Sequence, residues 1–398
     1  MKKKYNIKND FGNSTNKMYI NEARVDQPSV VKRIFGSVPV TEGSTEQNIL
    51  NLFNQLNVHI TSPALSRDGH FILGERALQN PDKSENMNIK IGNKAEHDIP
   101  VIMSLASTAA YAVKDYFEAK GELPATLDID GVLSGCIPAS EWSPNRARYL
   151  EERFTGTTAK PTSHIVIVYV GYEKVTVTIT YSKAKITQEG VPGLYALIEA
   201  DEDILANFRE LYKNNPKVVG MTQRDLAGKK GLGIDIGSGT TEYIHTHGVN
   251  PMLDTCDGKK RGVGHASEEA AKLLNSSLGN RLNINRQRFD NILLDVEDNY
   301  HEMAVNFMEE AQYDEAKNIM VDVEERYSVI SGDIDFIWVF GGGSITFKKD
   351  LYPKLIKFAN EVQCLVLWIP EKYAIDLNIK GLKILHEKVF FKAEVDKA

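Results

Sequence analysis

The apolar and polar positions of this chain alternate between strand hairpins and helices, and they do so twice. Residues 4–10 and 17–23 have the alternation of two strands joined by a polar turn, and residues 231–245 repeat that hairpin around a second turn. Apolar residues three and four positions apart predict helices after each hairpin, one running to about Lys120 and a later one through Ile319 and Val323. This rhythm predicts an α/β architecture with duplicated halves.

The remaining stretches add detail to this outline. We expect a short strand leading into a helix over 70–79, a strand over 125–137, a helix over 146–154, a hairpin over 164–181 and a buried strand over 335–340. A helix over 264–279 has Ser267 as a candidate N-cap and Gly279 as its terminator. The segment 215–230 mixes Pro, Gly and charge and is the best candidate for a linker.

Composition narrows the class of protein. With 398 residues the chain exceeds the size of most single cores, so two domains are expected. The net charge of -7 argues against direct binding of DNA as its main role. No run approaches the roughly 18 apolar residues of a membrane span, and no apolar stretch follows the basic start as in a secretory leader. Three cysteines, far apart in sequence, fit a reducing compartment, so we expect a cytoplasmic protein.

The first hairpin places an acid and small polar residues at its turn. Asp10 ends the first strand, and Gly12, Asn13, Ser14 and Thr15 follow before Lys17. Glycine lets the backbone bend sharply, and the small side chains and N–H groups can surround an anion. Taken alone, this stretch is explained more simply as a hairpin turn with a polar tip.

Two later turns carry the same chemistry. Asp235 is followed by Gly237, Ser238, Gly239, Thr240 and Thr241, an order of acid, glycines and hydroxyls that is more specific for phosphate than a plain turn. The buried strand 335–340 runs into Gly341, Gly342, Gly343 and Ser344. Three glycines let a flat group approach the backbone, and a helix N-terminus after them favours an anion, although a tight strand-to-helix turn explains the triplet equally well.

Together the three turns indicate a clamp for a nucleotide. Two hairpins facing one another would hold a polyphosphate from both sides, and the glycine triplet would accommodate the nucleoside. Asp10 and Asp235 would then hold a hydrated Mg²⁺, which prefers carboxylate, phosphate and water oxygens. The chain has no GxxxxGK[ST] loop, so this is not a Walker-type site.

The order DxGxxxxK, DxGxGTTE and VxGGGS resembles the actin, chaperone ATPase and sugar kinase superfamily. Within it, the segments "LSGCIPASEWSPNRARYLEERFTG", "ITQEGVPGLYAL", "RGVGHAS" and "YAIDLNIKGLKIL" resemble ParM-type bacterial actins. The resemblance covers nearly the whole chain and implies a two-lobed fold of duplicated ribonuclease-H-like domains with the nucleotide in the cleft. It implies a first domain over 1–190, with 376–398 packing back on it, and a second over 191–375.

The resemblance also assigns roles to residues. It places residues 12–15 and Lys17 in a first phosphate loop, 237–241 in a second, and 341–344 beside the adenosine, with Asp10 and Asp235 at the metal. Glu151 matches the polar helix residue that orients the attacking water, although a solvated helix acid, as expected for Glu152, is the alternative. Lys8 and Asn9 depart from the family pattern, which has apolar residues before the first acid.

The function implied is that of a filament-forming, nucleotide-hydrolysing actin-like protein. It would bind ATP or GTP with Mg²⁺, polymerise with itself and move plasmid DNA through a DNA-binding adaptor protein, without touching nucleic acid or membrane. The alternative is a small-molecule, sugar-type kinase of the same superfamily. Such a kinase needs a general base aimed at a substrate hydroxyl, and no residue pattern here singles one out. A chaperone-like module would need a substrate-binding extension, and a cell-shape actin an apolar membrane element; neither is evident.

Two further features have simpler interpretations. His245 and His247 share one face of a strand and could form a metal-ligand pair. With no third ligand nearby in sequence, we expect an exposed pair of histidines. Trp338 stands beside the glycine triplet, but its strand is apolar throughout, so we expect a core residue rather than an adenine stacker.

Overall fold

The computed structural model describes residues 2–79, 84–87, 93–157 and 159–392, which form two compact units. The first unit comprises residues 1–137, 141–188 and 382–398, and the second comprises residues 138–140 and 189–381. Of the segment expected to return to the first domain, residues 393–398 lie outside the described part. The candidate linker 215–230 lies inside the second unit, where Val218, Met221 and Leu226 are buried, so it does not separate domains.

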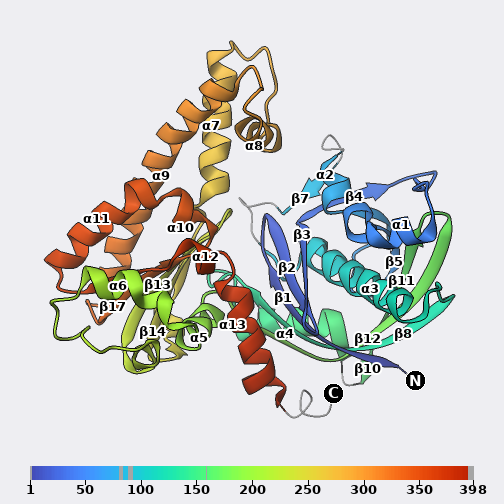
Figure 1. Cartoon of the computed structure of the whole chain (residues 1–398), viewed down its shortest axis with the longest axis horizontal. Helices are drawn as coiled ribbons and strands as arrows, with labels where there is room; N and C mark the ends of the chain where they lie inside the picture. The colour runs from blue at the N-terminus through green and yellow to red at the C-terminus, as the bar shows by residue number, and fades with distance from the viewer. Residues whose placement is uncertain (1, 80–83, 88–92, 158, 393–398) are drawn as a thin grey trace. The chain divides into compact units, whose positions relative to one another are not determined.

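A ten-stranded sheet forms the first unit (Figure 1). Its order is β3-β2-β1-β8-β12-β11-β5-β6-β4-β7, with bounds β1 (Lys3–Phe11), β2 (Thr15–Ile20), β3 (Ala23–Pro28), β4 (Val30–Ile34), β5 (Asn57–Thr61), β6 (Gly69–Leu73), β7 (Glu85–Asn86), β8 (Thr126–Ile137), β11 (Ser163–Val170) and β12 (Glu173–Gln188). Strands β1, β8 and β12 are parallel, and the β1–β2 and β11–β12 hairpins are antiparallel. The helices of this unit are α1 (Thr45–Leu50), α2 (Glu75–Leu78), α3 (Asp98–Lys120) and α4 (Pro144–Thr155), and Gly156–Thr157 (β9) pairs with Lys160–Pro161 (β10).

The two faces of strand β1 contact different parts of the chain. On one face Tyr5 packs edge-on against Tyr111 of α3, and Asn9 donates to Ser104 of the same helix over 2.6 Å. The alternate residue Lys8 forms an ion pair with Glu387 at 3.1 Å, so the C-terminal segment lies on the other face. Because successive strand side chains point to opposite faces, β1 is buried on both.

The second unit repeats the strand pattern in a smaller sheet. Its order is β15-β14-β13-β17-β18, with β16 also on β14; the bounds are β13 (Lys230–Ile236), β14 (Thr241–His247), β15 (Asn250–Pro251), β16 (Asp257–Lys259), β17 (Phe336–Phe340) and β18 (Leu365–Trp368). As in the first unit, an antiparallel hairpin supplies the first of three parallel strands, here β13, β17 and β18. The strand hairpin that the sequence predicts in each half is therefore present in both sheets.

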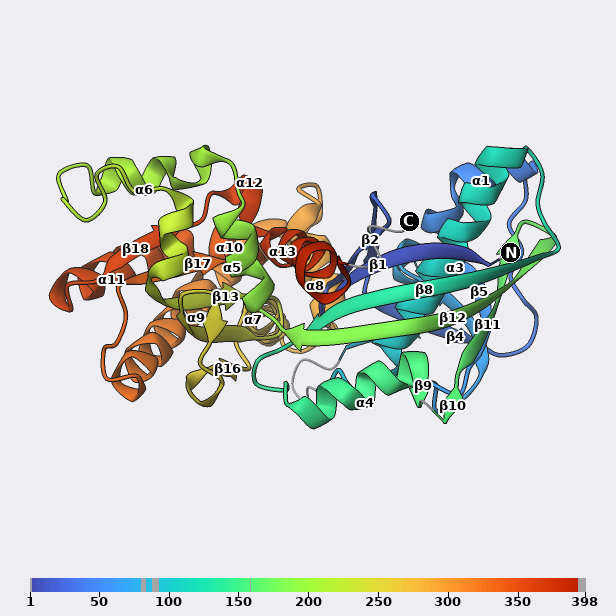
Figure 2. The ribbon, with the colours of Figure 1, turned by 90° about the horizontal axis from the view of Figure 1, so that it is seen from below.

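Helices cover both faces of this second sheet (Figure 2). Figure 2 shows α6 and α12 on one side of β17 and β18, and α9 and α11 on the other. In β17, Ile337 and Val339 pack into one core, whereas Phe336, Trp338 and Phe340 pack into a second core with α5 and α6. The helix bounds are α5 (Val191–Ile198), α6 (Ala206–Leu211), α7 (Val263–Ser277), α8 (Arg286–Leu294), α9 (His301–Val329), α10 (Gly342–Thr346), α11 (Lys348–Glu361), α12 (Glu371–Ala374) and α13 (Leu377–Leu385).

The N-cap of helix α7 lies five residues earlier than the sequence predicts. It is Gly262, and Ser267, the expected cap, is buried inside the helix; Gly279, one residue past the C-cap, has the left-handed φ of 65° expected of a terminator. No helix in the described ranges is both long enough and apolar enough to cross a bilayer.

Candidate functional site

The first candidate turn closes the β1–β2 hairpin of the first unit. Asp10 is 7% exposed at the end of β1 and lies opposite Lys17 in the hairpin register. Ser29 holds the turn by donating its hydroxyl to Gly12 O over 2.6 Å and its amide to Ser14 O over 2.9 Å. A Cβ on Gly12 would lie 2.2 Å from Thr15 O, so this turn closes only around glycine. Residues 12–15 therefore form a compact, fixed loop directly after a buried acid.

Buried polar contacts explain why Lys8 and Asn9 can precede this acid in a strand. Lys8 is 1% exposed, yet its ammonium reaches Glu387 and donates to Asn21 O over 3.1 Å. Burial lowers the pKa of Lys8, with Glu387 acting in the opposite direction. Because the Lys8 ammonium and the Asn9 Nδ2 group both have partners inside the unit, β1 continues without a break to Asp10.

Glu151 lies on α4 and is attached to the sheet. Its Oε1 accepts a hydrogen bond from Ile186 N over 2.9 Å and lies 3.6 Å from Lys185 Nζ. Three residues later, Phe154 stacks on Phe11, the neighbour of Asp10, with ring centroids 6.4 Å apart. Glu151 is therefore not the fully solvated acid that was the alternative. Its neighbour Glu152 is exposed.

The second candidate turn closes the β13–β14 hairpin and is held by helix α7. Gly237 N donates to Thr240 O over 2.9 Å, while Val263 and Gly264, the first residues of α7, donate to Gly237 O and Ser238 O. A Cβ on Gly262 would lie 2.3 Å from Gly237 O. The early start of α7 thus results from contact with this turn, which a cap at Ser267 would not allow.

The glycine triplet packs directly on Asp235. Gly341 has a φ of +87°, and a Cβ there would lie 2.5 Å from both Asp235 Oδ1 and Ile236 O. A Cβ on Gly343 would lie 2.4 Å from Ile236 Cγ2, whereas Gly342 is exposed with nothing within 4 Å of its Cβ position. Ser344 donates its hydroxyl to Gly341 O over 2.8 Å. In the second unit the structure therefore brings Asp235, the turn after it and the triplet together at the carboxyl ends of β13 and β17.

Asn378 is a site residue to which the sequence reasoning assigned no role. Its Nδ2 donates to Asp235 Oδ2 over 2.6 Å, and its Oδ1 accepts from Gly190 N over 3.1 Å. Asp235 is only 7% exposed, so this amide fixes the orientation of a buried carboxylate. The signal was present in the segment "YAIDLNIKGLKIL", where Asn378 stands three residues before Gly381, and a Cβ on Gly381 would overlap Pro192 O at 1.6 Å.

A cavity of about 470 Å³ in the second unit is lined by residues of α7, α8, α9 and the end of α10. Val263, which contacts the phosphate-type turn, and Thr346, which ends the helix of the triplet, both line it. Met308 of α9 and Asp290 of α8 form other walls, and burial raises the pKa of Asp290. The cavity has the size of a small-ligand pocket and mixes apolar walls with few polar groups.

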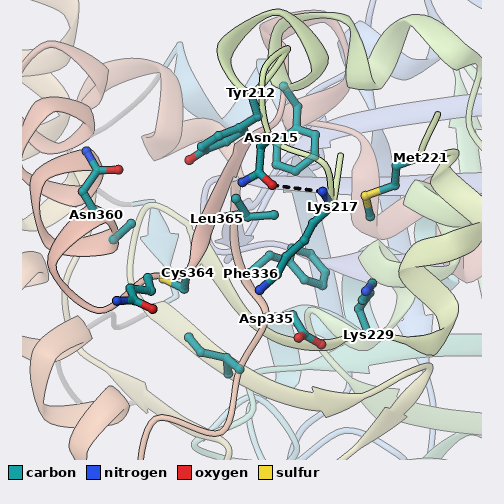
Figure 3. Close-up of a pocket in the computed structure, with 14 residues that line it drawn as sticks. Tyr212, Asn215, Lys217, Met221, Lys229, Asp335, Phe336, Asn360, Cys364 and Leu365 are labelled. Atoms are coloured by element: carbon teal, nitrogen blue, oxygen red, sulfur yellow. Dashed lines mark hydrogen bonds between the residues drawn. The ribbon is translucent and has the colours of Figure 1, made fainter. Parts of the chain in front are cut away.

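A second cavity, of about 420 Å³, lies at the amino ends of β17 and β18 in the same sheet (Figure 3). Phe336 and Leu365, the first residues of β17 and β18, line it together with Tyr212 and Lys217 (Figure 3). Ligands of parallel sheets bind outside the carboxyl ends of the strands, where the glycine turns lie. This second cavity is therefore too far along the strands to present a substrate hydroxyl to those turns.

The two histidines of β14 differ from the prediction. His245 is buried, 5% exposed, so the expectation of an exposed pair is wrong for it. Its environment includes Asp333, which the sequence places 88 residues away. Trp338, by contrast, is fully buried and stacks on Phe340 with ring centroids 4.8 Å apart, which confirms that it is a core residue.

Comparisons with known proteins establish the fold. Residues 233–352 match the family model described as the archaeal actin homologue MreB-like, C-terminal. The crystal structure of actin-like protein Alp7A aligns with a TM-score of 0.67 and 16% identity over 99% of each chain. The chain has the actin-like fold. This confirms the α/β class predicted from the repeated hairpins and helices and the actin-like fold implied by the resemblance of the glycine motifs.

Two other solved structures with the actin-like fold are similar to this chain. ParM of Bacillus thuringiensis with AMPPNP aligns with a TM-score of 0.59 and 16% identity, over 97% of this chain and 99% of that one. The archaeal actin homologue Ta0583 aligns with a TM-score of 0.60 and 15% identity, over 96% of this chain and 99% of that one. A search of curated proteins finds no match.

Proposed function

We propose that this chain is a filament-forming actin-like protein that binds and hydrolyses ATP or GTP. The observation that carries the proposal is the meeting of Asp235, the 237–241 turn and the glycine triplet at the carboxyl ends of β13 and β17 in the second unit. The structurally similar B. thuringiensis ParM was solved with ATP, ADP and AMPPNP, which supports a nucleotide as the ligand. In this proposal residues 237–241 and 12–15 bind the phosphates, with Lys17, and residues 341–344 border the nucleoside.

The donor set of the site fits Mg²⁺. Asp10 and Asp235 are both buried carboxylates at the ends of strands, one in each unit, and hard cations prefer such oxygens. Asn378 holds one oxygen of Asp235, and the thiol of Cys136 lies 3.6 Å from Asp10 Oδ1. A bound Mg²⁺ would offset the negative charge of the phosphates. The chain's own part is to hold the two acids in fixed orientations.

We assign Glu151 to positioning water for hydrolysis. Ile186 N fixes its Oε1, so the carboxylate is oriented before any nucleotide binds. A carboxylate held in this way can accept a hydrogen bond from water through its second oxygen. Neighbouring Glu152 is exposed, which makes it the matched control for this assignment.

Assembly and cargo complete the proposal. A single chain with two different ends that bind each other produces an open, head-to-tail filament. Because the net charge is -7, contact with plasmid DNA would pass through a basic DNA-binding adaptor protein of a partition system. The alternative of a sugar-type kinase is less well supported, because the cavity of about 420 Å³ lies at the amino ends of β17 and β18, away from the glycine turns.

The proposal is tested by phosphate release and sedimentation of the full chain with ATP or GTP, in Mg²⁺ and in EDTA. We expect Mg²⁺-dependent release and pelleting in the wild type, and loss of metal-dependent turnover in Asp235→Asn. Asp254→Asn, a change of an exposed acid in the same unit, is expected to behave as the wild type. Turnover that requires an added sugar, without pelleting, would favour the kinase instead.

A further inference from the structure

The second hairpin carries three metal-binding side chains at the end opposite its glycine turn. His245 and His247 lie near the end of β14, and Asp333 lies just before β17. Their ligand atoms all lie within 4.8 Å of one another. These residues stand at the amino ends of β13 and β17, whereas the glycine turns follow the carboxyl ends. The group is thus separate from the proposed nucleotide site.

His245 has a partner at each ring nitrogen. Because the Thr255 hydroxyl donates to Met252 O over 2.9 Å, Nδ1–H of His245 donates to Thr255 Oγ1, and the lone pair of Nε2 is on the side of Asp333. Its Nδ1 lies 2.8 Å from Thr255 Oγ1, and its Nε2 lies 3.4 Å from Asp333 O. A second partner on the opposite nitrogen is the usual way in which proteins orient a metal-binding histidine.

His247 and Asp333 complete the group. The Nε2 atom of His247 is buried and makes no hydrogen bond among the described residues, although Asp333 Oδ2 lies 3.2 Å away. The other carboxylate oxygen, Oδ1, is 2.5 Å from Lys230 Nζ, and Lys230 stands opposite His247 in the β13–β14 register. Lys230 therefore holds Asp333 by one oxygen while the other faces the imidazole.

We propose that His245, His247 and Asp333 bind a divalent transition-metal ion of the zinc type. Two imidazoles and a carboxylate suit Zn²⁺, Cu²⁺, Ni²⁺ or Co²⁺, whereas Mg²⁺ prefers oxygen donors alone. Tetrahedral zinc with bonds of about 2.0–2.2 Å places its donor atoms about 3.3 Å from one another. The ligand atoms of the three side chains lie within 4.8 Å of one another, so a modest rotation of these side chains brings them to that separation. Three protein ligands leave a fourth position for water.

A simple ion pair does not explain the whole arrangement. Lys230 and Asp333 already form an ion pair with each other. That ion pair does not require a buried histidine, His245, beside it. The three ligands come from a strand and from the loop before another strand, so a bound ion would join the end of β14 to the start of β17. A ligand that binds only the folded chain stabilises it by a free energy that grows with the logarithm of its concentration relative to its dissociation constant.

The test is a titration of the full chain with ZnCl₂ by isothermal calorimetry near pH 7.5, after treatment with a chelator. We expect saturable zinc binding in the wild type. In the double variant His247→Gln/Asp333→Asn the stoichiometry should be lower by one zinc per chain. Each single change is expected to weaken binding at least tenfold, on the scale of lost metal-site partners. Both positions are partly exposed, and circular dichroism in EDTA checks that the variants fold.

The matched control is His59→Gln. His59 is also a partly exposed strand histidine with a second imidazole nearby, that of His70 at 6.2 Å between ring centroids. The control is expected to keep the zinc stoichiometry, and zinc is expected to raise the Tm of wild type and control but not of the double variant. An unchanged stoichiometry and affinity in the double variant, or no saturable binding in the wild type, would overturn the proposal.

Discussion

Replacing Gly341 by alanine tests whether the glycine triplet is required by its contact with Asp235. Gly341 has a φ of +87° and a ψ of 164°, a backbone region essentially restricted to glycine, where an alanine costs at least about 1–2 kcal/mol of strain. Its Cβ would also lie 2.5 Å from the carbonyl oxygen of Ile236, which can be relieved only by moving the end of β13. Overpacking of this kind costs about 1–3 kcal/mol. The expected loss in the unfolding free energy of the second unit is therefore about 2–5 kcal/mol.

Gly342→Ala is the matched control, one residue further on. Gly342 has no atom within 4 Å of its Cβ position and lies in the first turn of α10 without a positive φ. Alanine there restricts the unfolded chain and favours the helix, so a gain of up to about 1 kcal/mol is expected. The two variants should thus differ in sign, although they change neighbouring residues by the same methyl group.

Urea unfolding followed by tryptophan fluorescence measures the difference. Trp338 is buried in β17, the strand that ends at Gly341, and reports on the second unit. With a slope of about 2 kcal/mol per molar urea, the midpoint should fall by about 1–2.5 M in Gly341→Ala. The variant should also bind nucleotide more weakly. Equal midpoints in the two variants would refute the steric reasoning.

Three further changes test other parts of the account. Glu151→Gln is expected to assemble with nucleotide but release phosphate at least tenfold more slowly, because the water-directed oxygen is replaced by an amide. Asn378→Asp places a second carboxylate beside Asp235, which raises the pKa of the pair in the folded state. The unfolding free energy of this variant should therefore fall as pH rises, and urea unfolding at pH 5 and at pH 8 measures the difference. Burial lowers the pKa of His386 from 6.5 to about 3, so the unfolded chain binds the extra proton first and the unfolding free energy should fall as pH drops from about 6.5 towards 3. His386→Gln should flatten that part of the profile.

Control variants and contradicting results distinguish these effects from nonspecific ones. Glu152→Gln, on the same helix, should leave phosphate release unchanged, and equal rates in the two glutamate variants would remove Glu151 from the mechanism. Asn360→Asp adds the same charge at an exposed position of α11 and should show no loss between pH 5 and 8. If wild type and His386→Gln lose stability in parallel on acidification, the buried histidine is not responsible.

Local features of the fold could be predicted from the sequence. Both glycine hairpins, the helix over 146–154 and the strand that runs into the triplet are present where the alternation predicts them. Each of these elements depends on residues a few positions apart, so its pattern can be recognised within a short stretch of sequence. The strand around Trp338 could be called buried because its apolar residues are continuous, as is usual for parallel strands covered on both faces.

Long-range contacts of polar groups could not be predicted in this way. Asn378 meets Asp235 across 143 residues, and Asp333 meets His245 across 88, so no spacing rule links them. Lys8 looks unsuited to a buried strand until Glu387 is placed beside it by the fold. The start of α7 was misplaced for the same reason, since Gly262 is fixed by its contact with Gly237 rather than by a capping side chain.

Electron microscopy of the full chain with Mg²⁺ and ATP, and separately with GTP, tests the proposed function most directly. We predict filaments with at least one of the two nucleotides, none in EDTA, and none after Asp10→Asn together with Asp235→Asn. The nucleotide-dependent assembly must be visible in the same samples that release phosphate. A protein that binds the nucleotide and releases phosphate but stays monomeric at all concentrations would contradict the account.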